Sequence, residues 1–313
     1  MSISTFLKLV EIQTKIASVF PFLIGCLFVY YRYDSFQPLN TMIFFLSMLT
    51  FDLTTTAINN YMDYRKASSE AYRLEHNIIG QKNISESTVI ITILCLLTLA
   101  TSLGIWLVFR TDLFVLLVGM VCFGIGIFYT FGPIPFSRMP LGEIFSGVTM
   151  GFGILFLAIY VSAYDQGIVQ LVWQGRMIRV EADILLVLEI ILISIPCVFT
   201  IANLMLANNI CDLEEDIYNQ RFTLPYYIGK KYAIWLFNGL YILSFTAIVV
   251  AVILGILPPL ILIVLLVSYP VYQLVRQFNI KQVKSETFSV AVKNLVLVNG
   301  SVVILLAVTV LFY

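Results

Sequence analysis

The chain has 313 residues, of which 60% are hydrophobic and 12% are charged. Soluble domains contain about 45–50% apolar and about 25% charged residues, so the composition excludes an ordinary soluble domain and predicts an integral membrane protein. The formal net charge is zero, and we expect no nucleic-acid partner. The five cysteines are scattered without a C-x-x-C pair, which favours packing over a disulfide or a metal site.

Apolar runs of about 17–25 residues predict nine membrane-spanning helices, and hence an all-α membrane protein. We place them near residues 16–32, 39–58, 87–109, 112–130, 142–164, 183–206, 231–253, 256–276 and 292–312. The fourth is short and ends at a Gly-Pro breaker, and the eighth carries three prolines. Residues 1–15 are expected to form an interfacial helix before the first span. We treat 1–313 as a single polytopic domain.

The distribution of positive charge predicts which side of the membrane each loop occupies. With nine spans and a cytoplasmic N-terminus, fourteen of the eighteen Lys and Arg residues fall on the inner side, as the positive-inside rule requires. They are Lys8, Lys15, Arg65, Lys66, Arg73, Lys82, Arg138, Arg221, Lys230, Lys231, Arg276, Lys281, Lys284 and Lys293. The two longest inner loops, 59–86 and 207–230, then face the cytoplasm.

The phrase Asn-Asn-x-x-Asp occurs twice, each time where a predicted span enters one of these two loops. The first copy is residues 59–63, and the second is residues 208–212, continued by Glu214, Glu215 and Asp216. Asn59 and Asp63, like Asp212 and Asp216, are four residues apart and would share a helix face. Hard oxygen donors of this kind suit Mg²⁺, which is usually held by one or two carboxylates together with substrate phosphate. Solvated surface charge is the simpler explanation for either cluster alone, but it does not explain the matched pair.

Other polar residues near the two phrases are candidates for substrate binding. Arginine offers a planar fork to phosphate and lysine a point charge, although anchoring to the inner leaflet explains some of these cations equally well. Asp52 lies inside the second span, where a carboxylate predicts a functional or supporting role. The candidate substrate-binding residues are Arg65, Lys66, Tyr129, Arg138, Asn209 and Arg221.

The sequence resembles the UbiA superfamily of intramembrane aromatic prenyltransferases, and most of all its menaquinone-forming branch, the 1,4-dihydroxy-2-naphthoate polyprenyltransferases. The resemblance rests on residues 9–15 with 21–25, 59–66, 129–143, 208–216 and 221–225. It implies one nine-helix bundle with a cytoplasmic cap formed by the two motif loops, in the plasma membrane. It also implies two Mg²⁺ ions, one held by Asn59 and Asp63 and the other by Asp212 and Asp216. Relatives carry a further aspartate beyond the first motif, where this chain has Ala67 to Ser69 and then Glu70.

The activity implied by the resemblance is transfer of a polyprenyl group from its diphosphate to dihydroxynaphthoate, with loss of CO₂, giving demethylmenaquinone. Tyr61, Tyr64, Phe128 and Tyr129 would offer aromatic faces to the allylic cation. Another acceptor, such as 4-hydroxybenzoate, is the main alternative. A transporter would carry its acids near the bilayer centre, and a lipid phosphotransferase would need an Asp-Gly-x-x-Ala-Arg string that the sequence lacks. No protein partner is evident. The sequence leaves prenyl length and oligomeric state open.

Overall fold

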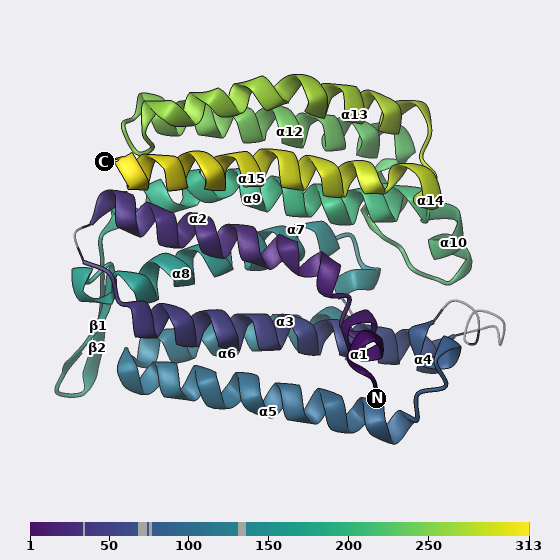
Figure 1. The fold of residues 1–313 in the computed structure, drawn as a ribbon, viewed down its shortest axis with the longest axis horizontal. Helices are drawn as coiled ribbons and strands as arrows, with labels where there is room; N and C mark the ends of the chain where they lie inside the picture. Colours follow the sequence, from purple (N-terminus) through teal and green to yellow (C-terminus); the bar gives the residue numbers. More distant parts are fainter. Residues whose placement is uncertain (34, 68–73, 75–76, 131–135, 313) are drawn as a thin grey trace. The chain divides into compact units, whose positions relative to one another are not determined.

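The computed structural model describes residues 1–33, 35–67, 74, 77–130 and 136–312, and it is almost entirely helical (Figure 1). Eight helices are long and apolar enough to cross a membrane, and a ninth apolar helix, Leu113–Tyr129, is shorter. Each corresponds to one of the nine spans expected from the sequence. The chain is therefore a multi-pass, mainly α-helical membrane protein, as predicted. It divides into two compact units, which are described separately.

The first unit comprises residues 1–16 and 39–135. It contains α1 (Ile3–Leu9), η1 (Ile12–Lys15), α3 (Pro38–Lys66), α4 (Ile78–Gln81), α5 (Glu86–Arg110) and α6 (Leu113–Thr130). Its core at the motif end of α3 is built from Leu9, Val10, Ala57, Ile79 and Val89, all fully buried. The short N-terminal helix is thus part of the packed unit and is not a free tail.

The second unit comprises residues 17–38 and 136–313. Its elements are α2 (Ile16–Arg32), η3 (Phe136–Arg138), α7 (Gly142–Ser146), η4 (Gly147–Gly153), α8 (Ile154–Ser162), η5 (Tyr164–Gln166), β1 (Val169–Gln174), β2 (Met177–Ala182), α9 (Ile184–Cys211), α10 (Leu213–Tyr218), α11 (Leu224–Ile228), α12 (Lys230–Ile253), η6 (Pro259–Val267), α13 (Ser268–Ile280), α14 (Lys284–Thr287) and α15 (Ser289–Phe312). The long helix α9 packs against α12, α15 and η4. Figure 1 shows α9, α12 and α15 running side by side.

Small residues let α9 approach its neighbour closely. A Cβ atom on Gly151 would lie 2.5 Å from the backbone nitrogen of Val198, and one on Gly147 would lie 2.7 Å from the Val198 carbonyl oxygen. Only glycine fits at such distances, which is the usual basis of close packing between membrane helices. Both glycines belong to η4, a π-helical stretch in the middle of this span. Gly147 and Gly151 are therefore packing residues of this span.

The structure differs from the sequence-based expectation in two places. The helix α3 continues through the first motif to Lys66, and α9 continues to Cys211, so the loops predicted to begin at residues 59 and 207 begin later. Polar residues mark the end of the membrane rather than the end of the helix, because a helix satisfies its own backbone hydrogen bonds in water as well. The second difference is an unpredicted antiparallel hairpin, β1–β2, between α8 and α9.

Candidate functional site

The first motif lies on the last turns of α3. Asn59 and Asp63 are half-buried, whereas Arg65 and Lys66, at the very end of the helix, are exposed. Arg65 Nη1 lies 3.5 Å from the hydroxyl of Tyr61, which donates a 3.0 Å hydrogen bond to Glu86. Glu70 and Arg73 fall outside the described residues. The first motif therefore brings one amide and one carboxylate to the same helix face, with cations beside them.

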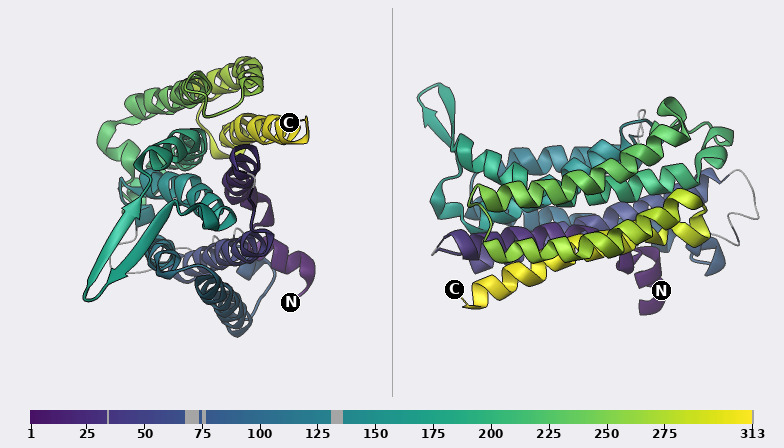
Figure 2. Two further views of the ribbon diagram at one scale, coloured as in Figure 1. Left: turned by 90° about the vertical axis from the view of Figure 1, so that its left-hand side faces the viewer. Right: turned by 90° about the horizontal axis from the view of Figure 1, so that it is seen from above.

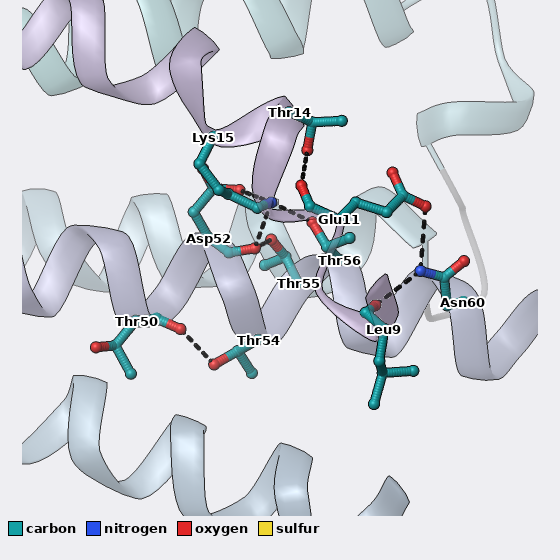
Figure 3. Close-up of polar contacts among 10 residues, drawn as sticks. All are labelled: Leu9, Glu11, Thr14, Lys15, Thr50, Asp52, Thr54, Thr55, Thr56 and Asn60. Atoms are coloured by element: carbon teal, nitrogen blue, oxygen red, sulfur yellow. Dashed lines mark hydrogen bonds and ion pairs between the residues drawn. The ribbon is translucent and has the colours of Figure 1, made fainter. Parts of the chain in front are cut away.

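The second asparagine of the first motif ties the N-terminal segment to α3. Asn60 Nδ2 donates to the carbonyl of Leu9 at 2.9 Å and to Glu11 Oε1 at 3.1 Å (Figure 3). Asn77 Nδ2 in turn donates to the Asn60 carbonyl at 2.9 Å. Glu11 has the left-handed backbone φ of 47° that turns the chain between α1 and η1. Asn60 is thus a positioning residue, since its amide hydrogens bond to the protein itself.

A buried ion pair joins η1 to α3, about two turns before Asn59. Lys15 Nζ contacts Asp52 Oδ1 at 2.7 Å, the Asp52 carbonyl at 3.2 Å and Thr56 Oγ1 at 2.5 Å (Figure 3). The lysine side chain is only 5% exposed and the aspartate side chain 15%. All three ammonium hydrogens can be bonded in this arrangement. Asp52 thus makes a polar contact that joins the N-terminal segment to α3, and its supporting role at the site stays a prediction.

The second motif lies where α9 passes into α10. Asp212 ends α9, its backbone N–H donating to the Asn208 carbonyl at 3.0 Å, and it also begins α10. The N–H of Asp216 donates to the Asp212 carbonyl at 2.7 Å, so the two residues are one helical turn apart. Asp216 is buried and Asp212 half-buried, whereas Glu214 and Glu215 are exposed.

Cations accompany both aspartates in the second unit. Arg221 Nη1 lies 3.8 Å from Asp216 Oδ1, and the Lys284 ammonium donates to Asp212 Oδ2. Arg221 Nε is buried and has no hydrogen-bond partner within the described part of the chain. Burial raises the pKa of Asp216 to about 6, an effect that Arg221 opposes and that the like charges of Asp212 and Glu215 strengthen. Burial therefore disfavours the charged form of Asp216 even though cations lie beside both aspartates.

Two further contacts hold the second motif in place. The N–H of Phe222 donates to the carbonyl of Arg138 at 3.2 Å, which joins the half-buried Arg138 segment to the loop after α10. Asn209 Nδ2 donates to Glu143 Oε1 at 2.8 Å, and both residues are buried. Glu143 lies in α7, directly before η4, and the close approach of η4 to α9 brings its carboxylate within hydrogen-bond distance of Asn209. Its other carboxylate oxygen is buried without a partner among the described residues.

The candidate residues thus fall into two groups. The first unit contains Asn59, Asp63, Arg65, Lys66 and Tyr129, which is half-buried in the last turn of α6. The second unit contains Arg138, Asn209, Asp212, Asp216 and Arg221. No local sequence pattern identifies Lys284 or Glu143 as neighbours of the second motif. They lie 72 and 66 residues away from Asp212 and Asn209, respectively.

Comparison with known proteins identifies the family. The model of the UbiA prenyltransferase family matches residues 18–312. The chain belongs to this family. This UbiA family member is thus a membrane prenyltransferase, as the motifs had indicated. A curated relative, the 1,4-dihydroxy-2-naphthoate octaprenyltransferase of Bacillus subtilis (strain 168), is 27% identical over 260 residues, which cover 83% of this chain and 77% of the relative.

Solved structures share the fold of this UbiA family member at low sequence identity. A UbiA homologue from Aeropyrum pernix K1 superposes with a TM-score of 0.66 at 15% identity, covering 93% of this chain and 98% of the homologue. A UbiA homologue from Archaeoglobus fulgidus, bound to GPP and Mg²⁺, superposes with a TM-score of 0.64 at 13% identity, covering 98% and 99%. The helical architecture expected from the family resemblance is confirmed.

Proposed function

We propose that this chain transfers a polyprenyl group from a polyprenyl diphosphate to an aromatic acceptor, 1,4-dihydroxy-2-naphthoate, with loss of the acceptor's carboxyl group as CO₂. The product would have the carbon skeleton of demethylmenaquinone. The observation that carries the proposal is the carboxylate pair at the end of a membrane helix, in which Asp216 is buried, Asp212 is half-buried and each lies beside a cation. The Bacillus relative, a 1,4-dihydroxy-2-naphthoate octaprenyltransferase, supports the acceptor, and the GPP and Mg²⁺ bound by the Archaeoglobus homologue support the donor and the metal.

The donor set fits Mg²⁺ at the second motif. Both side chains offer hard oxygens, and the pKa of about 6 for Asp216 reflects a negative charge that burial disfavours and a divalent cation would stabilise. Within the described residues no group of three His, Cys, Asp or Glu side chains could hold a metal alone. Diphosphate and water oxygens would complete the shell, as is usual for Mg²⁺. We propose that Asp212 and Asp216 hold one ion and Asn59 and Asp63 a second.

When bound, Mg²⁺ would neutralise the charge that develops on the diphosphate as the allylic C–O bond breaks. The chain's own residues would bind and orient the diphosphate. Arg221 would bind a phosphate oxygen: its buried Nε has no acceptor among the described residues, and arginine binds phosphate through paired donors. Arg138, whose carbonyl accepts a hydrogen bond from Phe222 in the loop after α10, would also bind the diphosphate. Arg65 and Lys66 are exposed at the end of α3 and would attract the diphosphate from solution.

Other residues would orient or shield the reacting groups. The hydrogen bond to Glu143 fixes the side chain of Asn209, the second asparagine of the second motif. We propose that Asn209 binds substrate and that its orientation depends on Glu143. Tyr129 would offer its ring face to the allylic cation, as would Tyr61, Tyr64 and Phe128. The surrounding bilayer would exclude water and accommodate the prenyl tail.

We further propose that the chain acts as one polytopic domain of the plasma membrane, with its N-terminus and both motifs on the cytoplasmic side. The support is the excess of Lys and Arg in the segments that carry the motifs. Labelling of a cysteine introduced at the exposed Glu214 with an impermeant reagent in intact cells tests this orientation. Rapid labelling from outside would contradict it.

The activity is tested with the purified protein in lipid, supplied with a radiolabelled polyprenyl diphosphate series and either dihydroxynaphthoate or 4-hydroxybenzoate. We expect Mg²⁺-dependent transfer to dihydroxynaphthoate, abolished by EDTA, with one CO₂ released per prenyl group from carboxyl-labelled acceptor. Preferential transfer to hydroxybenzoate without CO₂ release would exclude the naphthoate acceptor. Failure to transfer to either aromatic compound, by protein that still binds the donor, would exclude the proposal altogether.

A further inference from the structure

The hairpin between α8 and α9 has one apolar face that leaves the protein body. In the antiparallel register Val169 pairs with Ala182 and Leu171 with Val180, so these four residues lie on one face together with Ile178. The opposite face is mixed and carries Gln170, Arg179 and Glu181 together with Val172 and Met177. Val169 is 6% exposed, whereas Ile178 and Val180, farther along the same face, are 52% and 64% exposed. The apolar face thus begins against the protein and continues into its surroundings.

The direction of the hairpin is fixed at its base. The hydroxyl of Tyr160, near the end of α8, donates to the carbonyl of Val169 at 3.0 Å. The N–H of Asp183 donates to the carbonyl of Ile168 at 3.1 Å, and the Asp183 carboxylate accepts from Leu186 N at 3.0 Å, capping α9. Hydrogen bonds to both flanking helices therefore anchor the two strands.

The hairpin leaves the second unit across the direction of its helices. In Figure 1 β1 and β2 extend sideways from the end of the unit where α8 ends and α9 begins, and both views of Figure 2 show the hairpin projecting from that end. The flanking helices end at Ser162 and begin at Ile184, and both belong to membrane spans. A hairpin that leaves two membrane spans sideways runs along the membrane surface. This surface lies at the end of α9 opposite the second motif.

An isolated two-stranded hairpin is at best marginally stable in water, so its exposed apolar face requires a cover. The position of the hairpin supplies one: the boundary between lipid headgroups and acyl chains. Arg176 at the exposed tip and Arg179 on the opposite face can extend their guanidinium groups to the headgroups, as long basic side chains do at membrane interfaces.

We propose that the β1–β2 hairpin is an interfacial anchor, with Leu171, Ile178 and Val180 resting in the lipid surface on the side of the membrane opposite the second motif. The partner is the bilayer itself. The anchor fixes the depth of the adjoining ends of α8 and α9, and it does so independently of the enzyme's acceptor or metal.

The test uses the full chain in nanodiscs of phosphatidylcholine and phosphatidylglycerol, which leave both membrane faces open to reagent. Single cysteines replace Ile178 or Val180 on the apolar face, and Met177 or Arg179 on the other face. All four positions are exposed, so folding should be retained, and the native protein with its five cysteines provides the blank. A charged, membrane-impermeant maleimide should label Ile178→Cys and Val180→Cys about tenfold more slowly than Met177→Cys and Arg179→Cys, because the former lie within the interface.

Equal labelling rates on the two faces would overturn the proposal. The labelling is also compared between discs that hold one and two copies of the chain. If Ile178→Cys and Val180→Cys are protected only in discs with two copies, a second copy covers the apolar face, and the proposal is overturned. Protection in single-copy discs supports the lipid anchor.

Discussion

Lys15 Nζ lies 2.7 Å from Asp52 Oδ1, across 37 residues of sequence, and this pair joins the N-terminal segment to α3. Both side chains are nearly excluded from solvent, and Thr56 accepts a further bond from the same ammonium group. Asn60 forms a second link to the same segment, one helical turn beyond Thr56. The first motif therefore lies on a helix whose final turns are fixed from the N-terminal side.

Replacing Lys15 with methionine should destabilise the folded protein by about 3–5 kcal/mol, because the change leaves a buried carboxylate without its counter-ion. The double variant Lys15→Met, Asp52→Leu should recover most of this loss, since no uncompensated charge remains. Thermal unfolding in detergent measures both. Lys8→Met, which changes an exposed lysine of α1, is the control and should stay within about 0.5 kcal/mol of the native protein. A double variant as unstable as Lys15→Met would show that the pair is not the source of the loss.

Replacing Asp63, Asp212 or Asp216 individually with alanine should reduce Mg²⁺-dependent prenyl transfer by at least about a hundredfold, because each carboxylate would stabilise charge on the leaving group. Glu214→Ala should retain activity, since this exposed acid belongs to the same short helix but not to the proposed ligand set. Initial rates with radiolabelled donor give the comparison. Near-native rates in two of the three aspartate variants would be incompatible with two metal sites.

Replacing Lys284 with alanine should tighten Mg²⁺ binding in the absence of donor by about two- to fivefold, because an exposed lysine no longer competes for Asp212. Lys281→Ala is a matched control: that lysine contacts Glu286 at 2.6 Å, is similarly exposed and lies three residues away. Calorimetric titration with Mg²⁺ distinguishes the two variants. Weaker binding in Lys284→Ala would mean that the lysine assists the metal rather than opposing it.

Mg²⁺ binding should depend on pH around the raised pKa of Asp216. A metal ligand must be deprotonated, so affinity should be constant above about pH 7 and fall as the pH drops through about 6. Arg221 lowers this pKa, so Arg221→Gln should move the inflection to higher pH. Mg²⁺ titrations at a series of pH values locate the inflection. An unchanged inflection in Arg221→Gln, or one near the ordinary aspartate range, would argue against Asp216 as the titrating ligand.

Gly151→Ala should destabilise the protein by about 1–3 kcal/mol, the usual cost of forcing an extra methyl group into a packed interface. The new Cβ would lie 2.5 Å from the backbone of Val198, which cannot move as a side chain can. Gly153→Ala, in the same π-helical stretch, is the control because its Cβ would meet only the Val148 carbonyl, at 3.7 Å. The unfolding midpoint in detergent should fall for the first variant alone. Equal midpoints would mean that α9 can shift to accept the methyl group.

The membrane helices and the family were predictable because both depend on local pattern. Apolar runs of sufficient length predicted every span, and the short Asn-Asn-x-x-Asp phrases indicated the prenyltransferase family. Hydropathy, however, predicts which residues lie in the lipid and not where a helix ends, so it could not show that α3 continues to Lys66. The roles of the individual motif residues stay predictions.

The long-range contacts were not predictable because nothing near a residue in sequence identifies its distant partner. Lys15 was counted only as an inner-side cation, and its pairing with Asp52 depends on the fold of the N-terminal segment. The pairing of Glu143 with Asn209 depends on the glycines that bring η4 against α9. The hairpin, by contrast, had a readable signal: alternating apolar residues on both sides of Gly175, whose φ of 64° turns the chain. A search for long apolar runs passes over it.

The π-helical stretch Gly147–Gly153 also affects how mutations in this span should be chosen. Hydrogen bonds in a π-helix reach five residues back instead of four, so each turn holds more residues and the faces rotate relative to an ordinary helical wheel. A wheel drawn continuously from Gly142 to Ser162 would assign residues after Ile154 to the wrong side. Scanning mutagenesis of this span should therefore number α7 and α8 from separate origins, and sequence alignments with relatives that lack the π turn need a one-residue gap there.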